Sequence, residues 1–115
     1  MSRRNAALKA AARERKIPMG VYAVRNLATG LVRLGSSINV PAALNRHRFT
    51  LQMGSHPDKA LQGEWRRDGA DALVFEVLDL LPEKDELGTD RAEDLEALLG
   101  LWAAQLGEKV VGRLT

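Results

Sequence analysis

Residues 20–35 read GVYAVRNLATGLVRLG, and this stretch decides the fold. Apolar and polar residues alternate on both sides of Thr29-Gly30, which is typical of two strands joined by a turn. In the second strand, positions 31, 33 and 35 share one side and positions 32 and 34 the other. The stretch therefore predicts a β-hairpin.

The residues after the hairpin predict two helices and a third strand. SSIN (36–39) can cap a helix that has Pro41 in its first turn and runs to Gly54. Ser55 is expected to cap a second helix, PDKALQGEWRRDG (57–69). ALVFEVLDL (72–80) is rich in β-prone residues and predicts the third strand.

Helices are also expected at the two ends of the chain. MSRRNAALKAAARERK (1–16) has strong helix propensity and a weak apolar stripe. Near the other end, an Asp90-x-x-Glu93 capping box precedes an apolar repeat at helical spacing. That repeat consists of Leu95, Leu98, Leu99, Trp102 and Leu106.

The element order α-β-β-α-α-β-α predicts an α+β fold, in which a small, mostly antiparallel three-stranded sheet is flanked by helices. We expect three parts: a basic N-terminal helix over 1–17, the α+β domain over 18–108, and a C-terminal tail over 109–115. No cleavage site marks the N-terminal segment as a targeting peptide, so we expect a cytoplasmic protein.

Composition excludes several classes of site. The 115 residues include no Cys and two His, which excludes disulfides, thiolate metal sites and multi-histidine metal sites. A metal would need oxygen ligands, which favours Mg²⁺ or Mn²⁺. No apolar run is long enough to cross a membrane.

Charge is divided unevenly along the chain. Residues 1–67 contain 13 Lys and Arg against three acidic residues, whereas residues 68–115 contain four against twelve. The basic part suggests an anionic partner such as nucleic acid. The alternative is that the two halves neutralise each other within one fold.

From Gly20 to Leu78, the chain resembles the GIY-YIG endonuclease domain. Gly20-Val21-Tyr22 stands in place of the first triplet, and Arg33-Leu34-Gly35 in place of the second. Downstream motifs resemble the helical and third-strand segments of the phage-type members of this family. They are GSSIN (35–39), LNRH (44–47), GSH (54–56), LQ (61–62), EW (64–65) and FEVL (75–78).

The resemblance implies the fold of that family and phosphodiester cleavage with one divalent metal. It implies catalytic roles for Tyr22, as the first-triplet tyrosine, and for His47, as the helix histidine. Three other expected groups are replaced: Arg33 stands for the second tyrosine, Ala43 for the arginine, and Leu99 for the metal carboxylate.

Relocated residues are candidates for the missing roles. Arg33 is a candidate phosphate contact, Arg46 lies one helical turn beyond Ala43, and Glu96 is a candidate metal ligand one turn before Leu99. Three of the candidate catalytic residues also have a structural interpretation: Tyr22 as a strand tyrosine at the edge of the core, His47 as a packing residue, and Arg33 as a solvated strand residue. His56 is expected to be a loop residue at a helix start.

Arginine and lysine side chains of the two central helices are candidates for contacting nucleic-acid phosphates. They are Arg46, Arg48, Lys59, Arg66 and Arg67. A set of solvated helix faces is the alternative.

The leading hypothesis is a GIY-YIG-fold domain that binds nucleic acid, expected to be DNA, and has lost most of its cleavage activity; it would need no cofactor. The second is an active endonuclease dependent on Mg²⁺ or Mn²⁺. The third is a protein-interaction module. No membrane partner is expected, and the sequence leaves the oligomeric state open.

Overall fold

The expected hairpin forms the centre of the sheet. In a computed structural model that describes residues 17–82 and 91–114, strands β1 (Gly20–Asn26) and β2 (Val32–Ser37) pair antiparallel. Tyr22 lies opposite Gly35, and Val24 lies opposite Arg33. These four residues therefore share one face of the sheet.

Two further strands complete a mixed four-stranded sheet in the order β3-β1-β2-β4. Strand β3 (Leu73–Leu80) pairs antiparallel with β1, as the sequence predicts. Strand β4 (Val110–Leu114) pairs parallel with β2 and places Leu114 beside Gly35. The prediction of three strands was wrong because β4 lies in the segment expected to be a tail.

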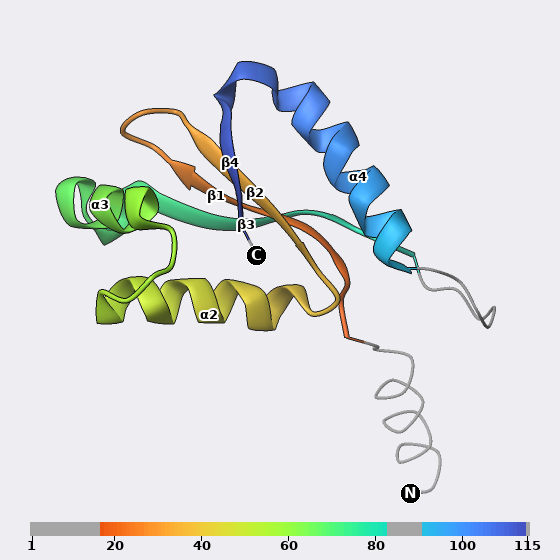
Figure 1. Ribbon diagram of the computed structural model, residues 1–115, viewed down its shortest axis with the longest axis horizontal. Coiled ribbons are helices and arrows are strands. Elements are labelled where there is room, and N and C mark those ends of the chain that lie inside the picture. The colour runs from red at the N-terminus through yellow and green to blue at the C-terminus, as the bar shows by residue number, and fades with distance from the viewer. Residues whose placement is uncertain (1–16, 83–90, 115) are drawn as a thin grey trace, which may run out of the picture.

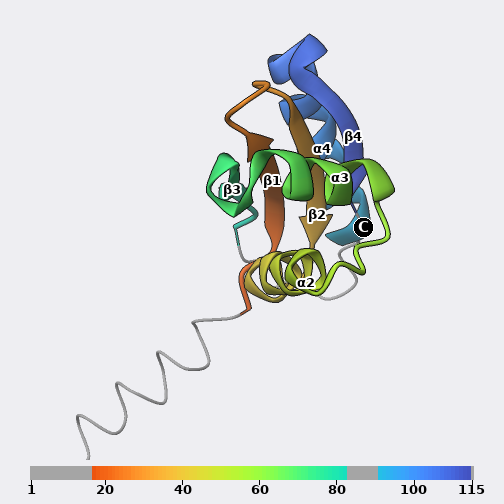
Figure 2. The same ribbon diagram turned by 90° about the vertical axis from the view of Figure 1, so that its left-hand side faces the viewer.

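Helices cover both faces of the sheet (Figure 1). Helices α2 (Val40–Met53) and α3 (Lys59–Asp68) lie on one face, and α4 (Arg91–Leu106) lies on the other. A view turned by 90° shows the sheet between the two layers (Figure 2). The α+β class is confirmed; the expected N-terminal helix and the Asp90 cap lie outside the described residues.

Side-chain caps set the helix starts. Asn39 accepts a hydrogen bond from the Ala42 amide, so the predicted SSIN cap is confirmed. The predicted Ser55 cap was wrong, since Asp58 caps α3 by accepting from the Leu61 amide. Two short 3₁₀ segments, η1 (Ala70–Ala72) and η2 (Gly107–Lys109), lead into β3 and β4.

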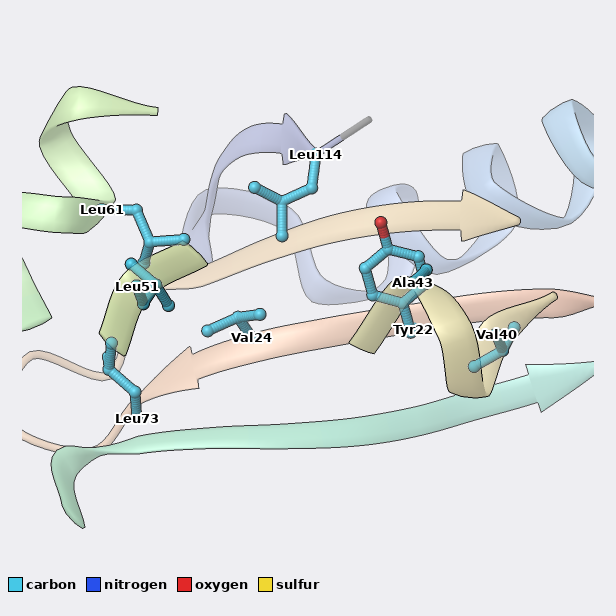
Figure 3. Close-up of a cluster of buried hydrophobic side chains, with 8 residues drawn as sticks. All are labelled: Tyr22, Val24, Val40, Ala43, Leu51, Leu61, Leu73 and Leu114. Carbon is cyan, nitrogen blue, oxygen red and sulfur yellow. The ribbon is translucent and has the colours of Figure 1, made fainter. Parts of the chain in front are cut away.

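Each layer has its own apolar core. Figure 3 shows the core beneath α2 and α3, in which the Tyr22 ring packs with Val24, Leu51, Leu61 and Leu114. The second core joins the α4 repeat to the opposite side of the hairpin and contains Val21, Leu34 and Leu99. Within the described residues, no helix is long and apolar enough to cross a membrane.

Candidate functional site

Tyr22 is placed by the strands that surround it. Its side chain is fully buried, and its ring extends from β1 over Gly35 of β2 toward Leu114 of β4 (Figure 3). A Cβ at position 35 would lie 2.3 Å from Tyr22 Cζ, so only glycine leaves room for the ring. The glycine of the second triplet and the tyrosine of the first are thus one packing unit.

Tyr22 is also the first of three aromatic side chains that are joined by hydrogen bonds. The Tyr22 hydroxyl lies 2.8 Å from His47 Nε2, and His47 Nδ1 lies 2.8 Å from His56 Nε2. His56 Nδ1 accepts a hydrogen bond of 2.9 Å from the Asp58 amide. We call these three side chains, Tyr22, His47 and His56, the relay.

Burial keeps the relay uncharged. Burial, with smaller contributions from His56 and Arg46, lowers the pKa of His47 to about 4. Burial also lowers the pKa of His56, although the Asp58 carboxylate opposes the shift. Burial raises the pKa of the Tyr22 phenol, and the Arg46 guanidinium acts in the opposite direction. At neutral pH all three rings are neutral.

A tight loop between α2 and α3 brings His56 to the relay. Helix α2 ends at Met53, and Gly54 caps it with a φ of 77°, a left-handed conformation that favours glycine. The buried Gln62 side chain then joins the loop to α2: its Oε1 accepts from the His56 amide, and its Nε2 donates to the Leu51 carbonyl. The backbone of His56 is therefore tied to α3 through Gln62 and, through the same side chain, to the end of α2.

An ionic network joins the hairpin to α3 beside the relay. The Arg33 guanidinium donates from Nε to Asp58 Oδ2 at 3.1 Å and from Nη1 to Glu64 Oε2 at 2.8 Å. Asn26 Nδ2 donates to Glu64 Oε1 and to Asp68 Oδ2. Arg33 is only 7% exposed, so these carboxylates balance a buried charge.

A pocket of about 300 Å³ opens next to the relay. Two arginines, Arg46 from α2 and Arg113 from β4, line it together with the two relay histidines. The other lining residues are Thr50, Pro57, Asp58 and Leu114. The Arg113 guanidinium pairs with Glu96 of α4, which leaves the Arg46 guanidinium as the positive group of the pocket that acts on the relay. A guanidinium beside a small concavity is suited to binding an anion of the size of a phosphate.

The structure brings some of the predicted site residues together and separates others. Tyr22, His47 and Arg46 meet at the pocket and its relay. Arg33 lies on the same face of the sheet, but its guanidinium contacts Asp58 and Glu64. Glu96 is exposed on α4, where it accepts a hydrogen bond from Arg113.

The five predicted phosphate-contacting residues are all exposed on α2 and α3. Arg48 also lies over the Phe75 ring, with its guanidinium carbon 4.6 Å from the ring centre, and Arg67 is paired with Asp68. Arg66 lies near Gly54, beside the loop that carries His56. The basic side chains thus surround the pocket side of the molecule without forming one cluster.

The donor set near the pocket does not fit the divalent metal that the resemblance implies. Asp58 is engaged by Arg33 and by the Leu61 amide, and two arginines line the same pocket. Over residues 17–82 and 91–114, no group of three or more His, Asp or Glu side chains is placed to hold a metal ion. Ala43 and Leu99 are both buried in the apolar cores.

Sequence reasoning missed His56, Asp58, Gln62 and Arg113 as parts of the site. Pairing of His56 with His47 depends on the Gly54 turn, and the position of Arg113 depends on the unpredicted strand β4. The nine-residue spacing of the two histidines across a helix end is the one feature that points to their pairing.

Comparison with known proteins identifies the fold. No protein-family profile and no curated protein sequence matches this chain. The solved catalytic domain of the homing endonuclease I-TevI is 22% identical to this chain, with a TM-score of 0.61, and the match covers 76% of this chain and 87% of that domain. A mutant of the catalytic domain of the intron endonuclease I-TevI gives 20% identity and a TM-score of 0.61 over 77% and 84% of the respective chains. I-TevI is a GIY-YIG homing endonuclease, so the fold predicted from the motifs is confirmed.

Proposed function

We propose that this chain is a nucleic-acid-binding domain with the GIY-YIG nuclease fold and with phosphodiester cleavage lost or much reduced. The observation that carries the proposal is Arg46 at a concave pocket beside two neutral histidines, on whose titration its positive charge acts. Arginine binds phosphate through paired N–H groups, and the pocket opens on the layer that carries the exposed arginines of α2 and α3.

Three replacements support reduced cleavage. Arg33, Ala43 and Leu99 occupy the positions of a tyrosine, an arginine and a metal carboxylate in the resembling family. Loss of one preorganised electrostatic group costs roughly a hundred- to a thousandfold in rate. Three such losses leave little catalysis even where the scaffold is intact.

Binding is tested by electrophoretic mobility shifts with DNA across a salt series. We expect a shift at low salt that weakens steeply as salt rises, because bound phosphates release counterions. Arg46→Gln should weaken binding and lower the salt dependence by about one counterion, a slope change near 0.9. Arg25→Gln is the matched control, since Arg25 pairs with Glu76 away from the pocket. Absence of any shift at low salt with DNA or RNA would contradict the proposal.

Cleavage is tested with supercoiled and single-stranded DNA in Mg²⁺ or Mn²⁺. We expect no cutting above a protein-free control. Cutting that disappears in both Tyr22→Phe and Glu96→Ala would instead establish an active endonuclease with relocated residues, and would end the claim of reduced activity.

A further inference from the structure

The relay has one possible direction of hydrogen bonding when both histidines are neutral. The Asp58 backbone amide is an obligatory donor, so His56 Nδ1 must carry a lone pair and its proton must sit on Nε2. His56 Nε2 then donates to His47 Nδ1, which places the His47 proton on Nε2. His47 Nε2 in turn donates to the Tyr22 hydroxyl oxygen.

The direction of these hydrogen bonds determines whether the Tyr22 hydroxyl donates or accepts within the relay. Its oxygen accepts from His47, so its own proton is left to be donated away from the relay. The reverse direction requires a proton on His56 Nδ1, which would face the Asp58 amide proton. A charged His56 meets the same conflict, because both ring nitrogens then carry protons.

The direction therefore depends on the position of the Asp58 amide, and Asp58 is held by Arg33. Arg33 Nε contacts Asp58 Oδ2, while Asp58 Oδ1 accepts from the Leu61 amide at the start of α3. Arg33 Nη1 is anchored in turn by Glu64, six residues beyond Asp58 in α3. Arg33 lies on β2 and Asp58 caps α3, so the amide is fixed relative to the sheet that carries Tyr22.

We propose that Arg33 is a positioning residue for Tyr22: by holding Asp58, it fixes the tautomers of His56 and His47 and so directs the Tyr22 hydroxyl proton away from the relay. The position that a tyrosine occupies in the resembling family thus has a different use in this chain. The inference goes beyond the proposed function, since it concerns hydrogen bonds within the protein and holds whether or not nucleic acid binds.

Charged groups from three parts of the fold lie around the relay. Arg46 comes from α2, Arg33 comes from β2, and Asp58 and Glu64 come from the cap and the middle of α3. Arg33 lowers the pKa of His56, whereas the Asp58 carboxylate raises it. Removing Arg33 should therefore raise the pKa of His56, and removing the Asp58 carboxylate should lower it. The proposal requires that both changes allow His56 to adopt either tautomer.

Long-range ¹H–¹⁵N correlation spectra of the imidazoles measure tautomer and titration together. In the wild type at pH 7, both histidines should show protonated Nε2 and unprotonated Nδ1. In Arg33→Met, His56 should become a mixture of tautomers, with a higher titration midpoint. In Asp58→Asn, which keeps the backbone amide and an oxygen for capping, His56 should also become a mixture, with a lower midpoint.

Arg25→Met is the matched control, because it removes a paired arginine from the same hairpin on the opposite face of the sheet. Backbone amide spectra report whether each variant is folded, and Asp58→Asn decides the result if Arg33→Met does not fold. Wild-type histidines in the opposite tautomer would overturn the proposal. Wild-type tautomer populations in a folded Arg33→Met or Asp58→Asn variant would overturn it as well, because a change of charge alone can only move the midpoint.

Discussion

At the scale of single residues, Gly35 shows how closely the site depends on backbone packing. An added methyl group there would lie 2.3 Å from Cζ and 2.4 Å from the hydroxyl oxygen of Tyr22. We expect Gly35→Ala to destabilise the protein by about 1–3 kcal/mol, the usual cost of overpacking a rigid core. Urea denaturation measures this change. Gly100→Ala is the control: it lies in α4 with open space around the added methyl, and should stabilise by about 0.5–1 kcal/mol.

His47 makes stability depend on pH. Its pKa falls from 6.5 to about 4 on folding, so the folded protein binds fewer protons than the unfolded chain between these values. The resulting stabilisation is fully present above pH 6.5 and is lost as pH falls toward 4. A shift of this size corresponds to roughly 3 kcal/mol.

Replacing His47 with Gln should remove most of that dependence. We expect the free energy of unfolding to fall less between pH 7.5 and pH 4.5 in His47→Gln than in the wild type, by about 2–3 kcal/mol. Urea titrations at both pH values measure the difference. Equal pH dependence in the two proteins would mean that the His47 ring is not held neutral by the fold.

At the scale of elements, the sequence predicted the helices and strands that have a periodic pattern of apolar residues. The hairpin, the third strand and the three described helices follow from alternation, apolar spacing and capping residues. Strand β4 could not be predicted this way, because VVGRL is short, contains a glycine, and has no alternation of its own. Its pairing with β2 is a long-range event, as is the pairing of His47 with His56 across the Gly54 turn.

Strand β4 is bound to the sheet by Leu114 as well as by backbone pairing. Leu114 is 6% exposed and packs into the core that contains Tyr22, whereas Val111 is 46% exposed. We expect Leu114→Ala to cost about 2–4 kcal/mol, and Val111→Ala to cost less than about 0.5 kcal/mol. Urea denaturation distinguishes them; similar losses would show that β4 contributes no buried contact.

At the scale of the whole molecule, the sheet separates layers of unlike charge. The exposed arginines and lysine of α2 and α3 lie on one side, and Glu93, Asp94 and Glu96 lie on α4 on the other. Within residues 17–82 and 91–114, the uneven charge of the sequence becomes a difference between two layers of the fold. A polyanion is attracted to the α2 and α3 layer and repelled from the α4 layer.

This separation predicts that nucleic-acid binding depends on where a basic residue lies more than on the net charge of the protein. Lys59 and Arg66 are seven residues apart on α3 and share one helix face. The double variant Lys59→Gln/Arg66→Gln should weaken DNA binding and lower the slope of log affinity against log salt by up to about 1.8. The double variant Arg25→Gln/Lys109→Gln removes the same charge from residues outside that layer, and should leave the slope nearly unchanged. Fluorescence anisotropy with a labelled duplex at four salt concentrations gives both slopes. Equal slopes in the two double variants would mean that binding follows total charge, and that the α2 and α3 layer is not the interface.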